Sequence, residues 1–489
     1  MTMLRNSSIL TCGINKYGVI KRMMKEKTLL FENKRLKKAM RRICLGLLAV
    51  MLLAALAGCG KNPLNPKSPV TITLWHTYGQ QMEITIGSLI EEFNHTVGKD
   101  RGIIVEIGYV ADAAEMNELL HSAANREPGA KALPDMAVIY PRIGVTLAEK
   151  GLLLNLSEQF SESELSLYVP NFLEEGKLTG GNLYILPIAK STEILYLNKT
   201  IFDRFAADTG VTLAQLATME GIAEAGEKYH QWSGGKAFFY PVELFNTALI
   251  GMRQLGEDFV RDYSLNLSSP AFKKIWDAYY PAAVKGETAI YDYYGNLLMA
   301  TGDVICVSGT TAGVTFYTNQ VMYPDNTKES IELTFLPYPV FTGGEKVVLQ
   351  RGGGICIFRS DQQREYAAGV FLKWLTEPEQ NLRFTAQNGY IPVIESLYED
   401  FLSDGLENIT NDNIRQVYET VREMKREYSF YYPPAFDGID DMKIFYNRSL
   451  RSAAAKSRGD YLSLIEAQGA DAAYENVSRG VFEQFIAPR

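Results

Sequence analysis

The alternation of strand-like and helix-like segments is the feature that most constrains how this chain folds. Between Val70 and Leu74 apolar residues alternate with threonines, as in a half-buried strand. Apolar residues from Met82 to Phe93 then recur at helical spacing, and the run GIIVEIGYV at 102–110 returns to a strand pattern. A further helix over 112–125 leads into the apolar run LPDMAVIY. This order predicts an α/β domain with a largely parallel sheet.

The alternation continues toward the C-terminus. A helix is expected over 361–376, with Ser360 as its N-cap. A later amphipathic helix is marked by apolar residues on one face, namely Ile414, Val417, Tyr418, Val421 and Met424.

The N-terminal segment has the layout of a secretory signal. A basic block, KRLKKAMRR at 34–42, precedes an apolar run at 43–57 that is shorter than the roughly 20 residues a membrane-spanning helix needs. The four residues Leu56 to Cys59 resemble the lipoprotein box of bacteria, in which cleavage leaves the cysteine to carry lipid. We expect residues 1–58 to be a signal peptide, Cys59 to be the lipid anchor and 59–69 to be a linker. Secretion without lipid is the alternative.

Charge and length limit the function of the processed chain. Removing residues 1–58 leaves 431 residues with 37 basic and 55 acidic side chains, a net charge of −18. Such acidity argues against nucleic acid and anionic lipid as partners, and this length favours two cores. Cys306 and Cys356 lie in apolar runs and are expected to be buried thiols, although a disulfide between them stays open. The histidines show no metal-ligand spacing, so no metal is expected.

Five ordered motifs carry a resemblance to a known family. The strongest is GNLYILPIAKSTEILYLNKTIF at 181–202, and the others are LWHTY, LPDMAV, LNLSSPAFKKIWDAY and AAGVFLKWLTEPEQNLRFTAQNGYIPV. Together they resemble the extracellular solute-binding proteins of ABC importers, in the group that takes up sugars and glycerol phosphate. The resemblance covers residues 70 to 400.

The resemblance implies a two-lobed periplasmic-binding-protein fold, similar to type II, with hinge crossings and a central ligand cleft. It places the crossings near 188–190 and 349–353. The implied first lobe is 70–188 plus 353–398, and the second is 189–352 plus 399–489. The glycines of QRGGGIC supply backbone freedom that a crossing needs, although an ordinary glycine turn would look the same.

Aromatic and polar residues near the expected strand ends are the candidate ligand contacts. Aromatic faces pack well against the C–H face of a sugar, and loops at the carboxyl ends of strands open toward the crevice. A run of hydroxyls from Ser308 onward could also present donors to an anion at a helix start. The resemblance to glycerol-phosphate binders implies further contacts, because Ser191, Ser308, one of Gly352 to Gly354, and Tyr390 match a serine, a cleft serine, a glycine contact and a cleft tyrosine of that group. The full set of candidates is Trp75, His76, Tyr78, Tyr140, Ser191, Thr192, Ser308, Gly309, Thr310, Gly353, Tyr390 and Asp437.

The solute class rests on one departure from the family. Glycerol-phosphate binders place an arginine in a late segment that here reads PPAFDGIDD, with Asp437 in its place. A carboxylate repels phosphate but accepts hydrogen bonds from sugar hydroxyls. The sequence therefore favours a carbohydrate, with glycerol 3-phosphate or a glycerophosphodiester as the alternative.

The implied role is binding and delivery at the extracytoplasmic face of the cell membrane. The chain has no Gly-x-x-x-x-Gly-Lys-[Ser/Thr] motif, so membrane permease subunits and an ATPase are the expected partners, without a cofactor. An enzyme is not expected, because no Gly-x-Ser-x-Gly elbow occurs. An anchored glycoside hydrolase or a sensor lobe is the alternative from another class.

Overall fold

The first lobe is built on a five-stranded mixed sheet. This is a computed structural model, and it describes residues 63–403 and 405–487. The strand order in this sheet is β2-β1-β3-β14-β4. The strands are β1 (Val70–His76), β2 (Ile103–Tyr109), β3 (Met136–Ile139), β4 (Ile185–Pro187) and β14 (Gly354–Ile357).

Helices cover both faces of this sheet. On one face Phe93 and Phe371 pack edge to face, with ring centroids 5.1 Å apart, and on the other Leu120 and Leu147 join a smaller apolar cluster. The helices are α2 (Gln80–His95), α3 (Val97–Arg101), α4 (Ala113–Asn125), α5 (Pro141–Glu149), α6 (Glu162–Leu165), α7 (Pro170–Glu175), α13 (Gln362–Leu375) and α14 (Pro378–Thr385).

The second lobe is built on a six-stranded sheet. Its strand order is β15-β13-β5-β9-β6, and β12 also pairs with β5. The strands are β5 (Ser191–Asn198), β6 (Phe239–Pro241), β9 (Cys306–Thr310), β12 (Leu333–Pro337), β13 (Val347–Arg351) and β15 (Ser429–Tyr431). Two hairpins lie outside it, formed by β7 (Val260–Arg261) with β8 (Ser264–Leu265) and by β10 (Gln320–Met322) with β11 (Lys328–Ser330).

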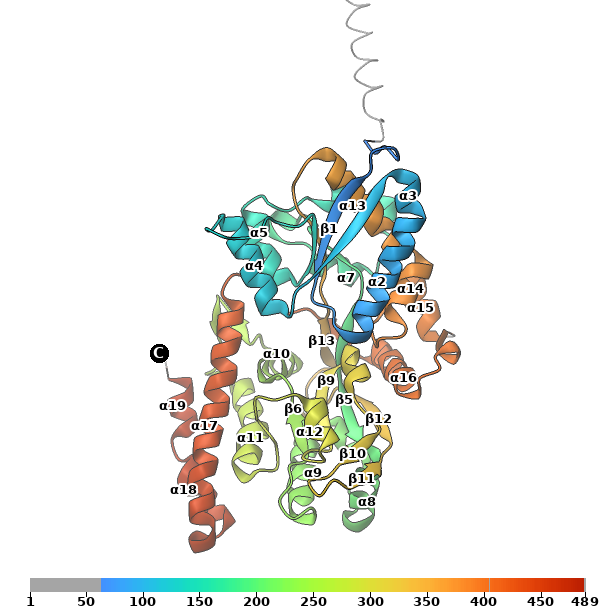
Figure 1. Cartoon of the computed structure of the whole chain (residues 1–489). Coiled ribbons are helices and arrows are strands. Elements are labelled where there is room, and N and C mark those ends of the chain that lie inside the picture. Colours follow the sequence, from blue (N-terminus) through green and yellow to red (C-terminus); the bar gives the residue numbers. More distant parts are fainter. Residues whose placement is uncertain (1–62, 404, 488–489) are drawn as a thin grey trace, which may run out of the picture. The chain divides into compact units, whose positions relative to one another are not determined.

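Helices surround the second sheet, and a long C-terminal helix packs along one side (Figure 1). In the contact between α17 and α11, the hydroxyls of Tyr280 and Ser457 are 2.6 Å apart. The helices are α8 (Lys199–Thr209), α9 (Met219–Trp232), α10 (Leu244–Gln254), α11 (Pro270–Lys285), α12 (Gly295–Ala300), α15 (Glu395–Ser403), α16 (Asp412–Glu427), α17 (Ile439–Gln468), α18 (Ala470–Ser478) and α19 (Val481–Ile486).

The structure confirms the α/β class, and the first sheet is largely parallel with one antiparallel strand. In the first sheet β1 is parallel to β2 and β3, whereas β14 is antiparallel to both β3 and β4. The physical reason is connectivity, because β14 directly follows a strand of the other sheet and enters from the opposite end. The sheet is therefore mixed, although the opening strands are parallel as predicted.

Three local predictions can be compared with the structure. The five apolar residues listed for the late amphipathic helix are all buried on α16, which confirms it. Cys306 and Cys356 are buried free thiols in different sheets. The N-cap prediction was wrong, because the side chain of Asp361 accepts from the N–H groups of Gln363 and Arg364 and caps α13.

A buried carboxylate after α11 makes the stability of the second lobe depend on pH. Burial raises the pKa of Glu287 to about 7. The charge of Lys285 lowers this pKa in part, and the charge of Glu227 raises it further. Because the folded pKa lies above the unfolded one, this contribution to stability is fully present below the ordinary carboxyl pKa and is lost as the pH rises through about 7.

We therefore expect Glu287→Gln to remove this loss. As the pH rises from 4.5 to 8, the unsubstituted protein loses stability that the variant keeps. The difference in unfolding free energy between the two proteins should therefore change by on the order of 2 kcal/mol in favour of the variant. Urea unfolding at several pH values measures the difference. A difference that does not change with pH contradicts the prediction.

Candidate functional site

The chain passes between the two sheets three times, and two of these crossings are short, closely packed segments. The first is residues 188–190, between β4 and β5, and the second is residues 352–353, between β13 and β14. Gly352 has a φ of 98°, and a Cβ there would lie 2.7 Å from the carbonyl oxygen of Ala189. Only glycine fits this close approach without displacing the backbone.

A buried ion pair ties the two crossings together. Lys190 Nζ donates to Glu175 Oε2 at 2.7 Å and to the carbonyl of Gly352 at 3.0 Å. The side chains of Lys190 and Glu175 are 3% and 5% exposed, respectively. Gln350 Nε2 also donates to the Glu175 carboxylate, so α7 of the first lobe and β13 of the second share one polar cluster.

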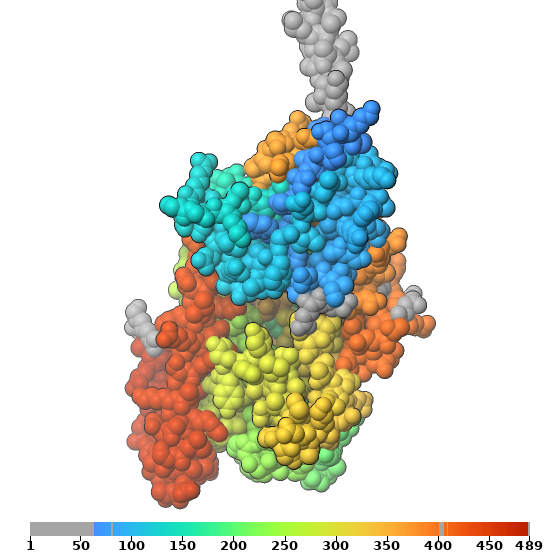
Figure 2. Space-filling view, in the orientation of Figure 1, coloured from blue at the N-terminus to red at the C-terminus, as the bar shows by residue number. Residues whose placement is uncertain are grey.

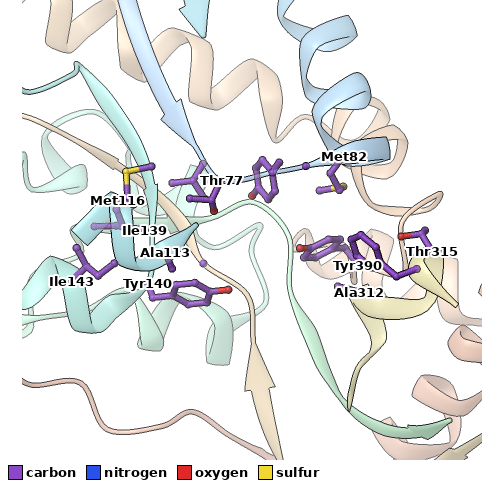
Figure 3. Close-up of a pocket in the computed structure, with 15 residues that line it drawn as sticks. Thr77, Met82, Ala113, Met116, Ile139, Tyr140, Ile143, Ala312, Thr315 and Tyr390 are labelled. Atoms are coloured by element: carbon purple, nitrogen blue, oxygen red, sulfur yellow. The ribbon is translucent and has the colours of Figure 1, made fainter. Parts of the chain in front are cut away.

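A cavity of about 190 Å³ lies beside these crossings, between the lobes. Figure 3 shows apolar residues of the first lobe, including Met116, Ile139 and Ile143, on one side and Ala312 and Thr315 of the second lobe on the other. We call this the first cavity. Its lining residues are Thr77, Tyr78, Gly79, Met82, Ala113, Met116, Val138, Ile139, Tyr140, Ile143, Ala312, Thr315, Phe316, Gly353 and Tyr390.

Three half-buried tyrosines supply most of the polar groups of the first cavity. Tyr78 follows β1, Tyr140 follows β3 and Tyr390 follows α14. Figure 3 shows Tyr140 and Tyr390 on opposite sides of the cavity. Burial, with the nearby phenols adding to it, raises the pKa of Tyr78 and of Tyr390. Both hydroxyls therefore stay protonated near neutral pH and can donate and accept hydrogen bonds.

A second cavity of about 250 Å³ adjoins the first, and Tyr140 and Ala113 line both. Three cationic residues line it, and each is paired with a carboxylate. Arg142 Nε lies 2.6 Å from Asp440 Oδ1, Lys443 Nζ lies 2.6 Å from Glu243 Oε2, and Arg351 pairs with the buried Glu193. The guanidinium of Arg142 also lies 4.6 Å from the Tyr140 ring centroid. The cavity is thus polar, but its charged pairs balance.

The strand β1 ends later than the sequence pattern suggested, which displaces two candidate ligand contacts. Because β1 continues to His76, Trp75 lies inside the strand and packs over Gly108 of β2. His76 is fully buried, its Nδ1 accepts from the N–H of Tyr78, and burial lowers its pKa. Neither side chain lines the two cavities, whereas Thr77 and Tyr78, just beyond the strand, line the first.

The hydroxyl residues near the second-lobe strands are also engaged inside the protein. Ser191 and Thr192 are buried in β5, and Thr192 Oγ1 donates to the carbonyl of Leu349 at 2.9 Å. Ser308 is buried in the middle of β9, Gly309 faces the Tyr196 ring, and the Thr310 carbonyl accepts from the Tyr196 hydroxyl. The segment that reaches the cavity is the following turn, through Ala312, Thr315 and Phe316.

The structure does not bring Asp437 to either cavity. Helix α17 begins at Ile439, so Asp440 in its first turn lines the second cavity, while Asp437 precedes the helix and is exposed. Sequence reasoning missed the charged set of Arg142, Arg351 and Lys443. These residues come from elements far apart in the chain, and the signal that could have found Arg351 was its place directly before the glycine run.

Comparison with known proteins gives a family and a fold. The family model for bacterial extracellular solute-binding proteins matches residues 88–413. No protein of curated function matches the chain by sequence.

Solved structures share the fold at low identity. A cyclic α-maltosyl-1,6-maltose binding protein from Arthrobacter globiformis is 18% identical with a TM-score of 0.63, covering 85% of this chain and 100% of its own. UgpB from Mycobacterium tuberculosis, in complex with glycerophosphocholine, is 17% identical with a TM-score of 0.64, at 86% and 100% coverage. A Listeria monocytogenes ABC substrate-binding protein in complex with cycloalternan is 15% identical with a TM-score of 0.63, at 86% and 98% coverage.

The ion pair beneath the crossings yields a stability prediction. Lys190→Met leaves the Glu175 carboxylate buried without its cation, and we expect a loss of about 3–5 kcal/mol in unfolding free energy. Adding Glu175→Gln removes the uncompensated charge while keeping an acceptor for Gln350. Chemical denaturation of the single and double variants should show that the double variant recovers most of the loss. Equal destabilisation of both variants contradicts the role assigned to this pair.

Proposed function

Because the chain belongs to the bacterial extracellular solute-binding proteins, we propose that it captures a carbohydrate in the cleft between its lobes and delivers it to the permease of an ABC importer. The observation that carries this proposal is the pair of adjoining cavities at the crossings, joined at Tyr140. Each is smaller than the roughly 300 Å³ at which small-molecule pockets usually begin, and together they fall within that range.

The charge balance of the second cavity supports a neutral solute. Its three cations each have a carboxylate partner. A sugar hydroxyl can donate to a carboxylate and accept from a cation without breaking the balance. A phosphate would have to displace one of these carboxylates or lie next to it, which Coulomb repulsion disfavours. Asp437 does not bear on the choice of solute, because it lines neither cavity.

A glycerophosphodiester or glycerol 3-phosphate is the second candidate. Arg142, Arg351 and Lys443 all line one cavity, and an arginine that exchanged its carboxylate for phosphate would form strong charge-assisted bonds. The neighbour that holds glycerophosphocholine has the same fold. A binding panel must therefore include phosphorylated compounds.

Lobe closure is the inferred means of capture. We infer that residues 70–188 with 353–394 move as one body against residues 189–352 with 395–489, which moves the expected boundary at 398 to the start of α15 so that this helix stays whole. The Arg142–Asp440 pair joins α5 of the first lobe to α17 of the second at 2.6 Å. It would form only when the lobes approach, so it acts as a contact of the closed state.

We infer binding and delivery rather than catalysis, with no cofactor. Transport would require membrane subunits and an ATPase supplied by other chains. Cys59 is proposed as a lipid anchor that holds the protein at the extracytoplasmic face of the membrane, on the strength of the sequence resemblance alone. It lies outside the described residues. Among residues 63–403 and 405–487, none of the helices combines the length and the apolar composition that a membrane span requires.

The saccharide proposal predicts selective thermal stabilisation. The chain from residue 60 onward is melted with maltose, maltotriose, mannotriose, glycerol 3-phosphate and glycerophosphocholine. A ligand at 100 times its Kd adds about 2.7 kcal/mol to the unfolding free energy, which raises the Tm measurably. We expect a shift with a neutral saccharide that Tyr140→Ala abolishes.

The matched control is Tyr366→Ala, which changes a tyrosine on α13 outside both cavities. It should keep the ligand-induced shift. A shift produced only by the phosphorylated compounds contradicts the saccharide assignment and supports the second candidate.

The anchor proposal predicts that membrane association depends on Cys59. In bacterial cells that express the full chain, Cys59→Ser should move the protein from the membrane fraction to the soluble extracytoplasmic fraction and abolish incorporation of labelled palmitate. Cys306→Ser is the control, since that thiol is buried in β9. Unchanged labelling of the Cys59→Ser variant contradicts the anchor.

A further inference from the structure

The loop between α11 and α12 exposes several aromatic side chains in a short stretch. In the sequence IYDYYGNL, the exposed fractions of Tyr291, Tyr293 and Tyr294 are 61%, 55% and 72%. Single exposed aromatic residues are ordinary, whereas exposed apolar surface gathered in one place can mark a binding site; here the rings of Tyr293 and Tyr294 contact each other, with centroids 6.2 Å apart. We call Tyr291, Tyr293 and Tyr294 the tyrosine rim.

The backbone that carries the tyrosine rim is held from beneath. The hydroxyl of the buried Tyr240 lies 3.0 Å from the carbonyl oxygen of Tyr291 and 2.7 Å from that of Tyr293. Arg451 of α17 pairs with Asp292 at 3.0 Å. Because these contacts already fix the loop, ligand binding would cost little conformational entropy in ordering it.

Residues next to the tyrosine rim contact segments that lead to both cavities, although the rim itself lines neither. Asn296 Nδ2 donates to the carbonyl of Phe316 at 3.2 Å, and Phe316 lines the first cavity. Gly295 packs against Val242. Glu243, which follows Val242 in the chain, pairs with Lys443 of the second cavity. In Figure 2 the yellow-green surface near residue 290 faces forward on the second lobe, below the hollow between the lobes.

We propose that the tyrosine rim is an outer saccharide subsite, so that the solute is an oligosaccharide whose end extends out of the cleft. This inference rests on the proposed function and adds chain length to it. Tyrosine rings pack against the C–H faces of sugar rings and place a hydroxyl beside the sugar's polar edge. The charge of Asp292 is compensated by Arg451, which suits a neutral ligand.

The test compares affinities along a series of increasing chain length. Calorimetric titration with maltose through maltohexaose, and with mannobiose through mannohexaose, gives a Kd for each length. The variant is the triple change Tyr291→Ser, Tyr293→Ser and Tyr294→Ser. Tyr294 is the N-cap of α12, where serine is a favourable residue, so the fold should survive.

We expect the unsubstituted protein to bind longer oligosaccharides more tightly than the disaccharide. In the triple variant this gain should disappear, so that the longest oligosaccharide binds about tenfold more weakly, equivalent to about 1.4 kcal/mol, while the disaccharide Kd is unchanged. Tyr294→Ser alone should give a smaller loss of the same kind. Tyr263→Ser, at a tyrosine 77% exposed that lines neither cavity, is the control and should change neither.

Two negative results have different meanings. If the unsubstituted protein binds saccharides but the triple variant affects all lengths equally, or none, the outer subsite is overturned. If the tyrosine rim serves only for docking on membrane subunits, the triple variant should change the affinity for none of the saccharides. If no saccharide binds to the unsubstituted protein, the proposed function itself fails, and the inference fails with it.

Discussion

The buried pair of Lys190 and Glu175 is the interaction on which the arrangement of the two lobes depends. It joins the first crossing to α7, and the same ammonium group bonds the carbonyl of Gly352 in the second crossing. A buried pair contributes little net stability when complete but costs much when one partner is lost. Its role here is therefore positional, since it fixes where two of the three segments that link the sheets lie relative to each other.

The geometry of the cleft follows from that constraint. Because the crossings are packed closely, glycine is required at Gly352, and Gly353 can lie in the wall of the first cavity. Loops that end strands of the first sheet then bring Tyr78 and Tyr140 to the same space, and Tyr390 enters after α14. We propose that the solute binds in this cleft, where the paired charges of the second cavity favour a neutral, hydroxyl-rich molecule.

The sequence was most informative where a periodic pattern was long. The opening strands, the helices over α2 and α4, and the buried face of α16 follow directly from spacing. Tyr78, Tyr140, Tyr390 and Gly353 were also candidates from the sequence, and all four line the first cavity.

The candidate contacts that line neither cavity share one physical cause. The sequence pattern does not fix the residue at which a strand or helix begins or ends. Trp75 lies within β1 and not after it, so its ring packs, partly buried, against the smaller apolar cluster of the first lobe and lines neither cavity. The same effect leaves Ser308 inside β9, and the start of α17 selects Asp440 instead of Asp437. The ion pairs of the second cavity could not be predicted, because Arg142 and Asp440 meet only through the relative placement of the two lobes.

Hydrogen-exchange mass spectrometry with and without the most stabilising saccharide would show whether the solute binds between the lobes. We expect slower exchange at the crossings, in peptides covering 188–192 and 349–354, and at the cavity walls around 138–143 and 388–391. Opening of these segments should become rarer once the solute joins the lobes. Slower exchange confined to another surface, such as the groove between α17 and α19, would contradict a solute site between the lobes.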